Sequence, residues 1–181
     1  MSSFLLPLRQ KIGDWLNSYT PNRNDGTSFR GPLADKRSVL IVTALASDSD
    51  KETLANLKHE VKAMCPNAQI SILGYCPDPK NSPISDNNQV FITPKDISFF
   101  FKLNFPTLST LLNSTFDIAI ILNGDNYTNI NYIAKFIHAN LRVGQAGSAL
   151  DTQGILNFVV EAKDSHEPIS VKSCLQMVFD N

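Results

Sequence analysis

The segment Phe116–Gly144, FDIAIILNGDNYTNINYIAKFIHANLRVG, constrains the fold more than any other part of the chain. It begins with a continuous apolar run at 118–122, which is typical of a strand covered on both faces. Turn-forming residues at 123–126 come next, followed by apolar residues at helical spacing from 130 to 141 and a short strand at 141–144. A strand, a crossover helix and another strand predict a parallel sheet and an α/β fold.

Further strands are expected on both sides of this unit. Apolar and β-branched runs at 38–44, 70–75 and 90–92 predict three earlier strands, and the run 155–160 predicts the last one. A helix is expected between the first two strands, starting at Ser47-Asp48-Ser49-Asp50 and stopped by Cys65-Pro66. The sequence therefore predicts a three-layer, Rossmann-like α/β domain over residues 38–181, with a mainly parallel sheet of about five strands.

The first 37 residues form a separate part of the pattern. Residues 1–20 predict an amphipathic helix, and residues 21–37, rich in Pro, Gly and Asn, predict a linker or arm. The apolar stripe of that helix is expected to bind a protein partner or a second copy of the chain, because isolated apolar helices rarely stay bare in water. Its residues are Phe4, Leu5, Leu8, Ile12, Trp15 and Leu16. Packing on its own domain and lying on a membrane surface are the other possibilities for this helix.

Composition limits the classes of partner. The chain has 181 residues, 43% of them hydrophobic and 18% charged, as expected for one globular domain. Its formal net charge of −1 provides no global field toward nucleic acid or an anionic membrane. No apolar run reaches the roughly 20 residues that a membrane-spanning helix needs. Three cysteines without paired spacing indicate free thiols, and a cytoplasmic location is expected.

Catalytic and metal-binding patterns are absent from the sequence. No P-loop, zinc signature, nucleophile elbow or dinucleotide glycine fingerprint is present, so the sequence favours a protein without enzymatic activity, cofactor or metal. His59 and His138 are expected on helices, as surface or half-buried residues. The acid pairs Asp48/Asp50 and Asp78/Asp86 are interpreted as helix caps and turn formers. The phenylalanines between 99 and 105 are interpreted as core residues rather than a platform for bases, because only Lys102 among them is basic.

One place in the predicted fold is a candidate ligand-binding site. In open parallel sheets, ligands bind in the crevice beyond the carboxyl ends of the strands. The residues expected there are Ser47, Asp48, Ser49, Asn123, Gly124, Asp125 and Asn126. Helix capping alone is the favoured interpretation. If a ligand binds, the backbone N–H groups at the two helix starts are expected to hold it.

Two families resemble this chain. The first is an uncharacterised small α/β family of the Bacteroidota, which is similar from about Arg37 to Val160. The resemblance is carried by RSVLIVTALASDSDKETLANLKHEVKAMCPNAQISILGY, by VFITPKDISFFFKLN and by the segment Phe116–Gly144. The chain departs from that pattern at Ile121, where the family has an aspartate, and at Asn123, where it usually has a small polar residue. These motifs imply a fold and no reaction.

The second resemblance covers the segment Phe116–Gly144 alone. This segment is similar to a unit in the N-terminal domain of heptosyltransferase-like glycosyltransferases. Those enzymes hold a nucleotide sugar between two Rossmann-like domains, so half of such a cleft implies no transfer activity. Two functions are therefore expected as alternatives. The first is a non-enzymatic interaction protein, such as an accessory subunit of a larger bacterial assembly, and the second is a small-ligand or nucleotide-sugar-binding domain.

Overall fold

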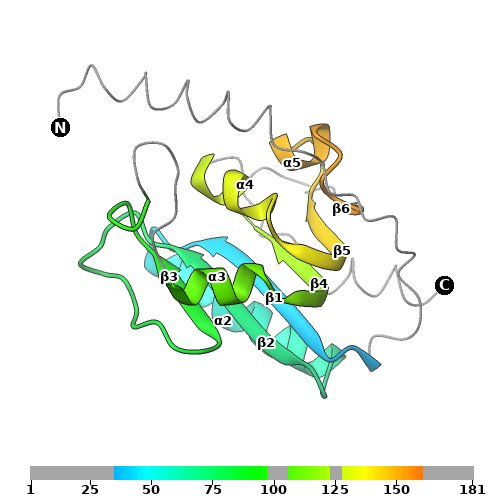
Figure 1. The fold of residues 1–181 in the computed structure, drawn as a ribbon. Coiled ribbons are helices and arrows are strands. Elements are labelled where there is room, and N and C mark those ends of the chain that lie inside the picture. Colours follow the sequence, from blue (N-terminus) through cyan, green and yellow to red (C-terminus); the bar gives the residue numbers. More distant parts are fainter. Residues whose placement is uncertain (1–34, 98–105, 123–127, 161–181) are drawn as a thin grey trace.

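The computed structural model describes residues 35–97, 106–122 and 128–160, which form a six-stranded parallel sheet with helices on both faces (Figure 1). All five strand pairings are parallel, and the strand order is β3-β2-β1-β4-β5-β6. The strands are β1 Ser38–Ala44, β2 Gln69–Tyr75, β3 Gln89–Ile92, β4 Thr115–Ile121, β5 His138–Gln145 and β6 Phe158–Val160. The predicted α/β class is confirmed, with six strands where about five were expected.

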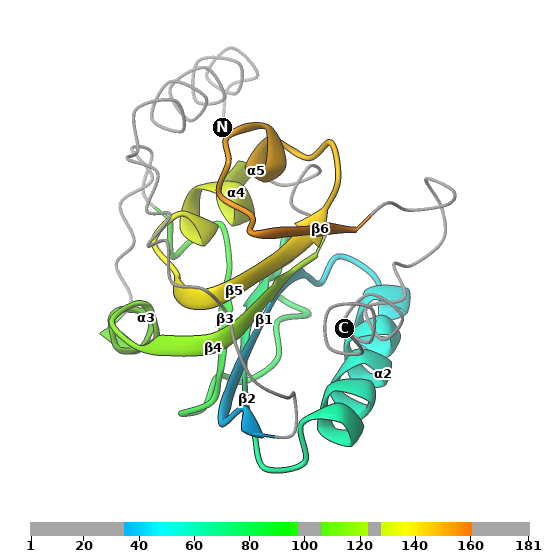
Figure 2. The ribbon, with the colours of Figure 1, turned by 90° about the vertical axis from the view of Figure 1, so that its right-hand side faces the viewer.

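In the described residues, four helices cover the two faces of this sheet. They are α2 Asp48–Met64, α3 Pro106–Leu112, α4 Thr128–Ala134 and α5 Ala149–Thr152. Figure 2 shows α2 on one side of the sheet and α3, α4 and α5 on the other. The predicted three-layer, Rossmann-like arrangement is therefore confirmed. The order of strands reverses between β1 and β4, and the helix that follows each of these strands covers a different face.

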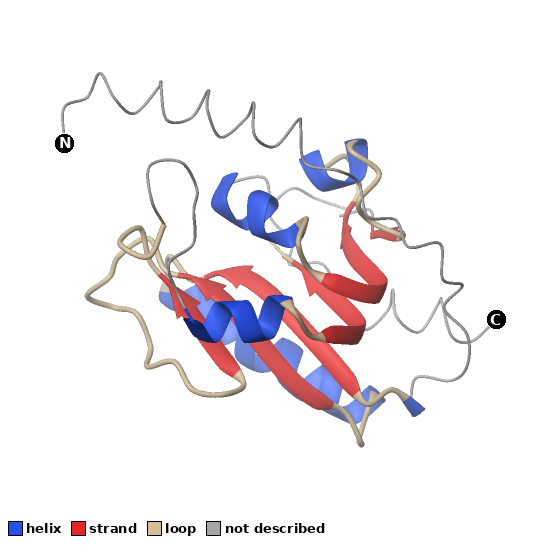
Figure 3. Ribbon diagram, in the orientation of Figure 1, coloured by secondary structure: helices blue, strands red, loops and turns tan. Residues whose placement is uncertain are grey.

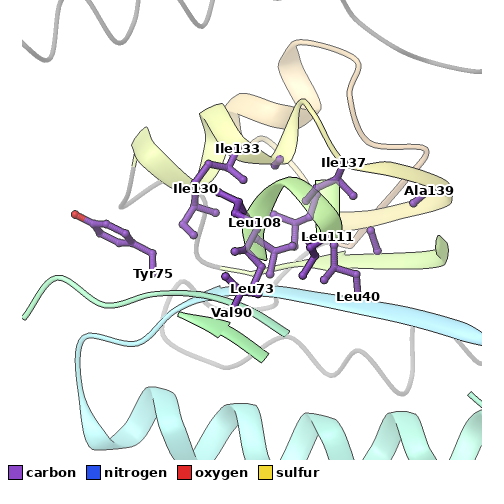
Figure 4. Packing of buried hydrophobic residues seen from close by; sticks show 14 of the residues in the cluster. Leu40, Leu73, Tyr75, Val90, Leu108, Leu111, Ile130, Ile133, Ile137 and Ala139 are labelled. Atoms are coloured by element: carbon purple, nitrogen blue, oxygen red, sulfur yellow. The ribbon is translucent and has the colours of Figure 1, made fainter. Parts of the chain in front are cut away.

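Strand β1 shows why polar and apolar residues do not alternate along the apolar runs. Its residues 39–42 are 0% exposed, because β1 is paired on both edges and covered on both faces. Leu40 and Val42 pack toward α3 and α4, whereas Val39 and Ile41 pack toward α2. Figure 4 shows Leu40 on the same packed face as Leu108 and Leu111 of α3 and Ile130 and Ile133 of α4.

Helix α2 has the boundaries that the sequence predicts. Ser47 is its N-cap and Cys65 its C-cap, and Pro66 follows immediately. Its buried residues Leu54, Leu57 and Val61 recur at helical spacing and pack on the β1 and β4 face. The other face of the helix carries exposed polar residues, as expected for a helix on the outside of a sheet.

The structure corrects the helix predicted over 130–141. Helix α4 ends at Ala134, and β5 begins at His138, so His138 lies on a strand and not on a helix. The apolar residues Ala139, Leu141 and Val143 are buried at a spacing of two. A spacing of four between Ile137 and Leu141 fits both periods, and strand pairing with β4 decides between them.

The region before β6 is also different from the prediction. Residues 145–154 contain the short helix α5, which the sequence analysis does not predict. It is capped by Ser148, whose side chain accepts a hydrogen bond from the Asp151 N–H. The predicted strand 155–160 is shorter, because only Phe158–Val160 pairs with β5. Ile155 and Leu156 are buried against the sheet instead.

Several predicted features lie outside the described residues. These are the amphipathic helix 1–20, all but residues 35–37 of the arm, and the phenylalanines 99–105. In the ranges that the structure does describe, no helix is long and apolar enough to cross a membrane.

Candidate functional site

The crevice predicted from the sequence lies at the reversal of strand order between β1 and β4. The two strands are neighbours, with Val42 opposite Ile121, so the two crevice loops follow adjacent strands. Ser47, Asp48 and Ser49 lie exposed at the start of α2, directly beyond β1. The second predicted loop, Asn123, Gly124, Asp125 and Asn126, lies outside the described residues.

The start of α2 is capped by its own side chains. The Asp50 carboxylate oxygen Oδ2 accepts hydrogen bonds from the Ala46 N–H at 2.9 Å, the Ser47 N–H at 2.8 Å and the Ser47 hydroxyl at 2.9 Å. In return, Ser47 Oγ accepts a hydrogen bond from the Asp50 N–H at 3.2 Å. This is a reciprocal capping box, so the capping interpretation of Ser47 is confirmed.

Charge at this helix start is negative. The positive end of a helix attracts an anion, and here the Asp50 carboxylate supplies that negative charge. Asp48 adds a second carboxylate, which accepts a hydrogen bond from Lys51 Nζ at 2.8 Å. That hydrogen bond and the charge of Lys51 lower the pKa of Asp48 below its ordinary value, so Asp48 is ionised at neutral pH. A phosphate would meet a helix end that already holds a carboxylate.

Replacing Asp50 by alanine tests this cap. We expect the free energy of unfolding to fall by about 1 kcal/mol, because the N–H groups of residues 46 and 47 lose their acceptor. Chemical denaturation monitored by circular dichroism measures the change. The control is Ser49→Ala in the same turn, which is exposed and expected to stay within about 0.5 kcal/mol of the parent. Equal effects of the two substitutions would contradict the assigned role of Asp50.

A metal-binding cluster is not assembled in the part of the chain that the structure covers. Among the described residues, no three His, Cys, Asp or Glu side chains lie together as a metal site would require. Cys65 and Cys76 are free and buried, as predicted, and burial raises the pKa of both thiols, so they stay protonated and unreactive. His59 is exposed on α2.

Two buried cations were not anticipated from the sequence. Arg142 on β5 is 2% exposed, and its guanidinium NH1 donates to the Ile155 carbonyl at 3.4 Å. Its backbone N–H donates to the Asn157 side-chain oxygen at 3.0 Å, so this residue joins β5 to the segment before β6. Lys135 is 4% exposed, and desolvation lowers its pKa. A lone basic residue in a strand or turn carries no sequence signal of burial.

A cavity of about 610 Å³ opens at the other edge of the sheet, where the strands begin. That volume is within the range of small-molecule pockets. Its floor is formed by the first residues of three adjacent strands, which are Ser38 of β1, Gln69 and Ser71 of β2, and Thr115 and Phe116 of β4. This amino edge is opposite to the crevice that the sequence predicts, and the sequence analysis identified none of these residues.

The walls of this amino-edge cavity come from α3 and from the loop before β3. They comprise Asn87, Asn88, Thr110, Leu111 and Ser114. The loop, residues 76–88, runs from the end of β2 back to the start of β3 (Figure 3). Ser85 holds it along the free edge of β3, since its hydroxyl accepts a hydrogen bond from the Phe91 N–H at 2.9 Å. Among the described residues that line the two walls and the floor, none has an ionisable side chain.

Asp86 fixes the wall that carries Asn88. Its Oδ1 accepts hydrogen bonds from the N–H groups of Asn88 and Gln89, both at 2.7 Å, and these bonds lower the pKa of Asp86 below its ordinary value. The interpretation of Asp86 as a turn former is confirmed, and Asp78 plays the same part for Lys80 and Asn81.

The order of this loop should depend on acid pH. A carboxyl group with a lowered pKa contributes stability above the ordinary Asp value, near 3.8, and loses it as the pH falls through the folded value. We expect the Asp86 carboxyl carbon to titrate below that ordinary value in NMR spectra, with the Asn88 amide signal moving at the same midpoint. In Asp86→Asn the Asn88 signal should no longer follow this titration. A midpoint at or above the ordinary value would contradict the two hydrogen bonds.

Comparison with protein families gives a match over most of the chain. A family model described as a family of unknown function, DUF6913, matches residues 10–171, which is most of the chain. Neither the curated proteins nor the solved structures contain a match.

Proposed function

The chain belongs to DUF6913, a family of unknown function, and we propose from its own residues that it is a non-enzymatic interaction protein. In this proposal it serves as an accessory subunit of a larger bacterial assembly. The Rossmann-like sheet then acts as a rigid scaffold that presents a binding surface, rather than as the floor of a catalytic cleft.

The observation that carries the proposal is the self-capped start of α2. Rossmann-like enzymes place the phosphates of a cofactor on the helix after the first strand. Here the Asp50 carboxylate accepts three hydrogen bonds at that place, from two N–H groups and one hydroxyl. The loop before it, Leu45-Ala46-Ser47, has no glycine to allow close approach of a pyrophosphate. Both features oppose the usual chemistry of this fold.

The proposed interface is the apolar stripe of residues 1–20, which lies outside the described residues. Its members Leu8 and Trp15 are two turns apart in a helix, and Gln10 belongs to the opposite side of the pattern. A protein partner or a second copy of the chain is the proposed occupant. Arg9 and Lys11 alone give the segment too little positive charge to favour an anionic membrane surface.

The test compares two variants in the native cell. The full chain, the double variant Leu8→Asp/Trp15→Asp and the control Gln10→Asp are purified with the proteins bound to them, and the purified chains are examined by sedimentation. We expect the parent and the control to retain a stoichiometric partner or a dimer, and the double variant to lose it with unchanged circular dichroism. If all three chains behave alike, or if the double variant loses its fold, the stripe is not an interface.

A small-ligand or nucleotide-sugar-binding domain is the second candidate. It is favoured by the strand order, whose reversal between β1 and β4 is where such folds bind nucleotides. In this case the ligand contacts Ser47, Asp48 and Ser49 together with the loop 123–126. A ligand at 100 times its dissociation constant should stabilise the fold by about 2.7 kcal/mol, which a thermal-shift screen of nucleotides and nucleotide sugars detects. Gly124→Val and Asp48→Ala should each weaken that binding, and unchanged affinity in both variants would place the ligand elsewhere.

A further inference from the structure

The structure contains a second candidate ligand site at the edge of the sheet opposite to the predicted crevice. We propose that the amino-edge cavity binds an uncharged, hydroxyl-rich small molecule of the mono- or disaccharide class. The proposal is independent of the interaction function, since it uses other residues at another edge of the sheet.

The side chains that line the cavity indicate an uncharged, hydrogen-bonding ligand. Eight of the ten described lining residues have hydroxyl or amide side chains, and none of the ten is charged, so they offer hydrogen bonds without a counter-ion for a phosphate or carboxylate. Within the described ranges, the side chains of Ser71 and Thr115 make no hydrogen bond with another residue, which leaves both hydroxyls available to a ligand.

Two of the lining amides are held in place by each other. Gln69 Nε2 donates a hydrogen bond to Asn88 Oδ1 at 2.6 Å. This bond fixes both side chains and leaves the Gln69 carbonyl oxygen as an acceptor and the Asn88 amide group as a donor. A matched acceptor and donor beside two hydroxyls are the kind of groups that recognise neighbouring sugar hydroxyls. The buried residues Leu111 in the wall and Phe116 in the floor add apolar atoms to the lining, which suit the C–H face of a sugar ring.

A peptide is a poorer match for the same cavity. An extended peptide pairs with a free sheet edge, but β2, β1 and β4 are interior strands with both edges already paired. Recognition of a helix needs an apolar groove, and this lining is mainly hydroxyl and amide. A bounded cavity of about 610 Å³ has the size of a small-molecule site rather than of a protein interface.

Titration of the ¹⁵N-labelled full chain with glucose, N-acetylglucosamine and lactose tests the proposal. We expect at least one of these sugars to give saturable shifts of the Ser71, Asn88 and Thr115 amide signals. The double variant Ser71→Ala/Thr115→Val removes two hydroxyls with little change of shape and should weaken that binding about tenfold or more. Thr53→Val, which removes a hydroxyl on α2 at the face of the sheet away from α3, should leave the affinity unchanged.

Three outcomes would overturn the proposal. The first is the absence of saturable shifts with all three neutral sugars. The second is equal affinity of the parent and the double variant while both keep the same melting temperature, which would place the sugar elsewhere. The third is tighter binding of glucose 6-phosphate than of glucose, because the described lining residues offer no cation for the phosphate. Failure of the partner-recovery experiment would leave all three results unaffected.

Discussion

Replacing Ile41 by alanine should lower the free energy of unfolding by about 2–5 kcal/mol. Ile41 lies in the middle of β1, is 0% exposed, and packs in the cluster between the sheet and α2. Removal of three carbons there leaves a cavity that two paired neighbouring strands prevent from collapsing. Urea denaturation followed by circular dichroism measures the change in the midpoint at constant slope.

Ile84 provides the matched control. It has the same side chain but lies in the loop before β3 and is 93% exposed. Ile84→Ala should therefore stay within about 0.5 kcal/mol of the parent. If the two alanine substitutions cost the same, the burial of β1 at the centre of the sheet would be wrong.

Asp117→Ala should have the second largest effect, a loss of about 1–3 kcal/mol in the free energy of unfolding. The Asp117 Oδ2 atom accepts hydrogen bonds from the Arg37 N–H at 2.8 Å, the Ser38 N–H at 3.0 Å and the Ser38 hydroxyl at 3.2 Å. These bonds join the start of β4 to the start of β1 across 79 residues of sequence. Loss of the carboxylate leaves part-buried donors without an acceptor, and thermal or urea denaturation measures the cost.

Asp78→Ala is the control for this second effect. Asp78 also accepts hydrogen bonds from two residues, Lys80 at 3.0 Å and Asn81 at 2.8 Å, but it does so within an exposed turn. We expect a change of less than about 1 kcal/mol. An equal loss in Asp78→Ala would show that the hydrogen bonds between β1 and β4 contribute no more to the free energy of unfolding than those of an exposed turn.

The sheet was predictable because a strand that is buried on both faces has a continuous apolar run in the sequence. Residues 39–42 and 118–121 are continuous apolar runs, and both are central strands. The hydrophobic pattern does not identify the element where a helical and a strand period coincide. Ile137 and Leu141 have a spacing that fits a helix, but pairing with β4 makes Leu141 a strand residue. Helix α5 has only four residues, too few to establish a helical period, and only its Ser148 cap signals it.

The two candidate sites also differ in how far the sequence predicts them. Capping by Ser47 was predictable, because a cap depends on residues three positions apart in the sequence. The amino-edge cavity was not predictable, because Ser38, Ser71 and Thr115 meet only after β2, β1 and β4 have paired. Single serines and threonines at the start of strands are common, so nothing local marks these as neighbours. The long-range hydrogen bonds of Asp117 are hidden for the same reason.

The central claim is that the start of α2 is occupied by the chain's own carboxylate, so that the fold acts as a binding scaffold. Titration of the ¹⁵N-labelled full chain with UDP-glucose, read at the amide signals of Ala46, Ser47 and Asp50, tests it most directly. These three N–H groups take part in the capping box. We predict no saturable shift of any of these signals at millimolar UDP-glucose. Saturable shifts of the Ala46 and Ser47 signals would show that a nucleotide sugar displaces Asp50, and would contradict the account.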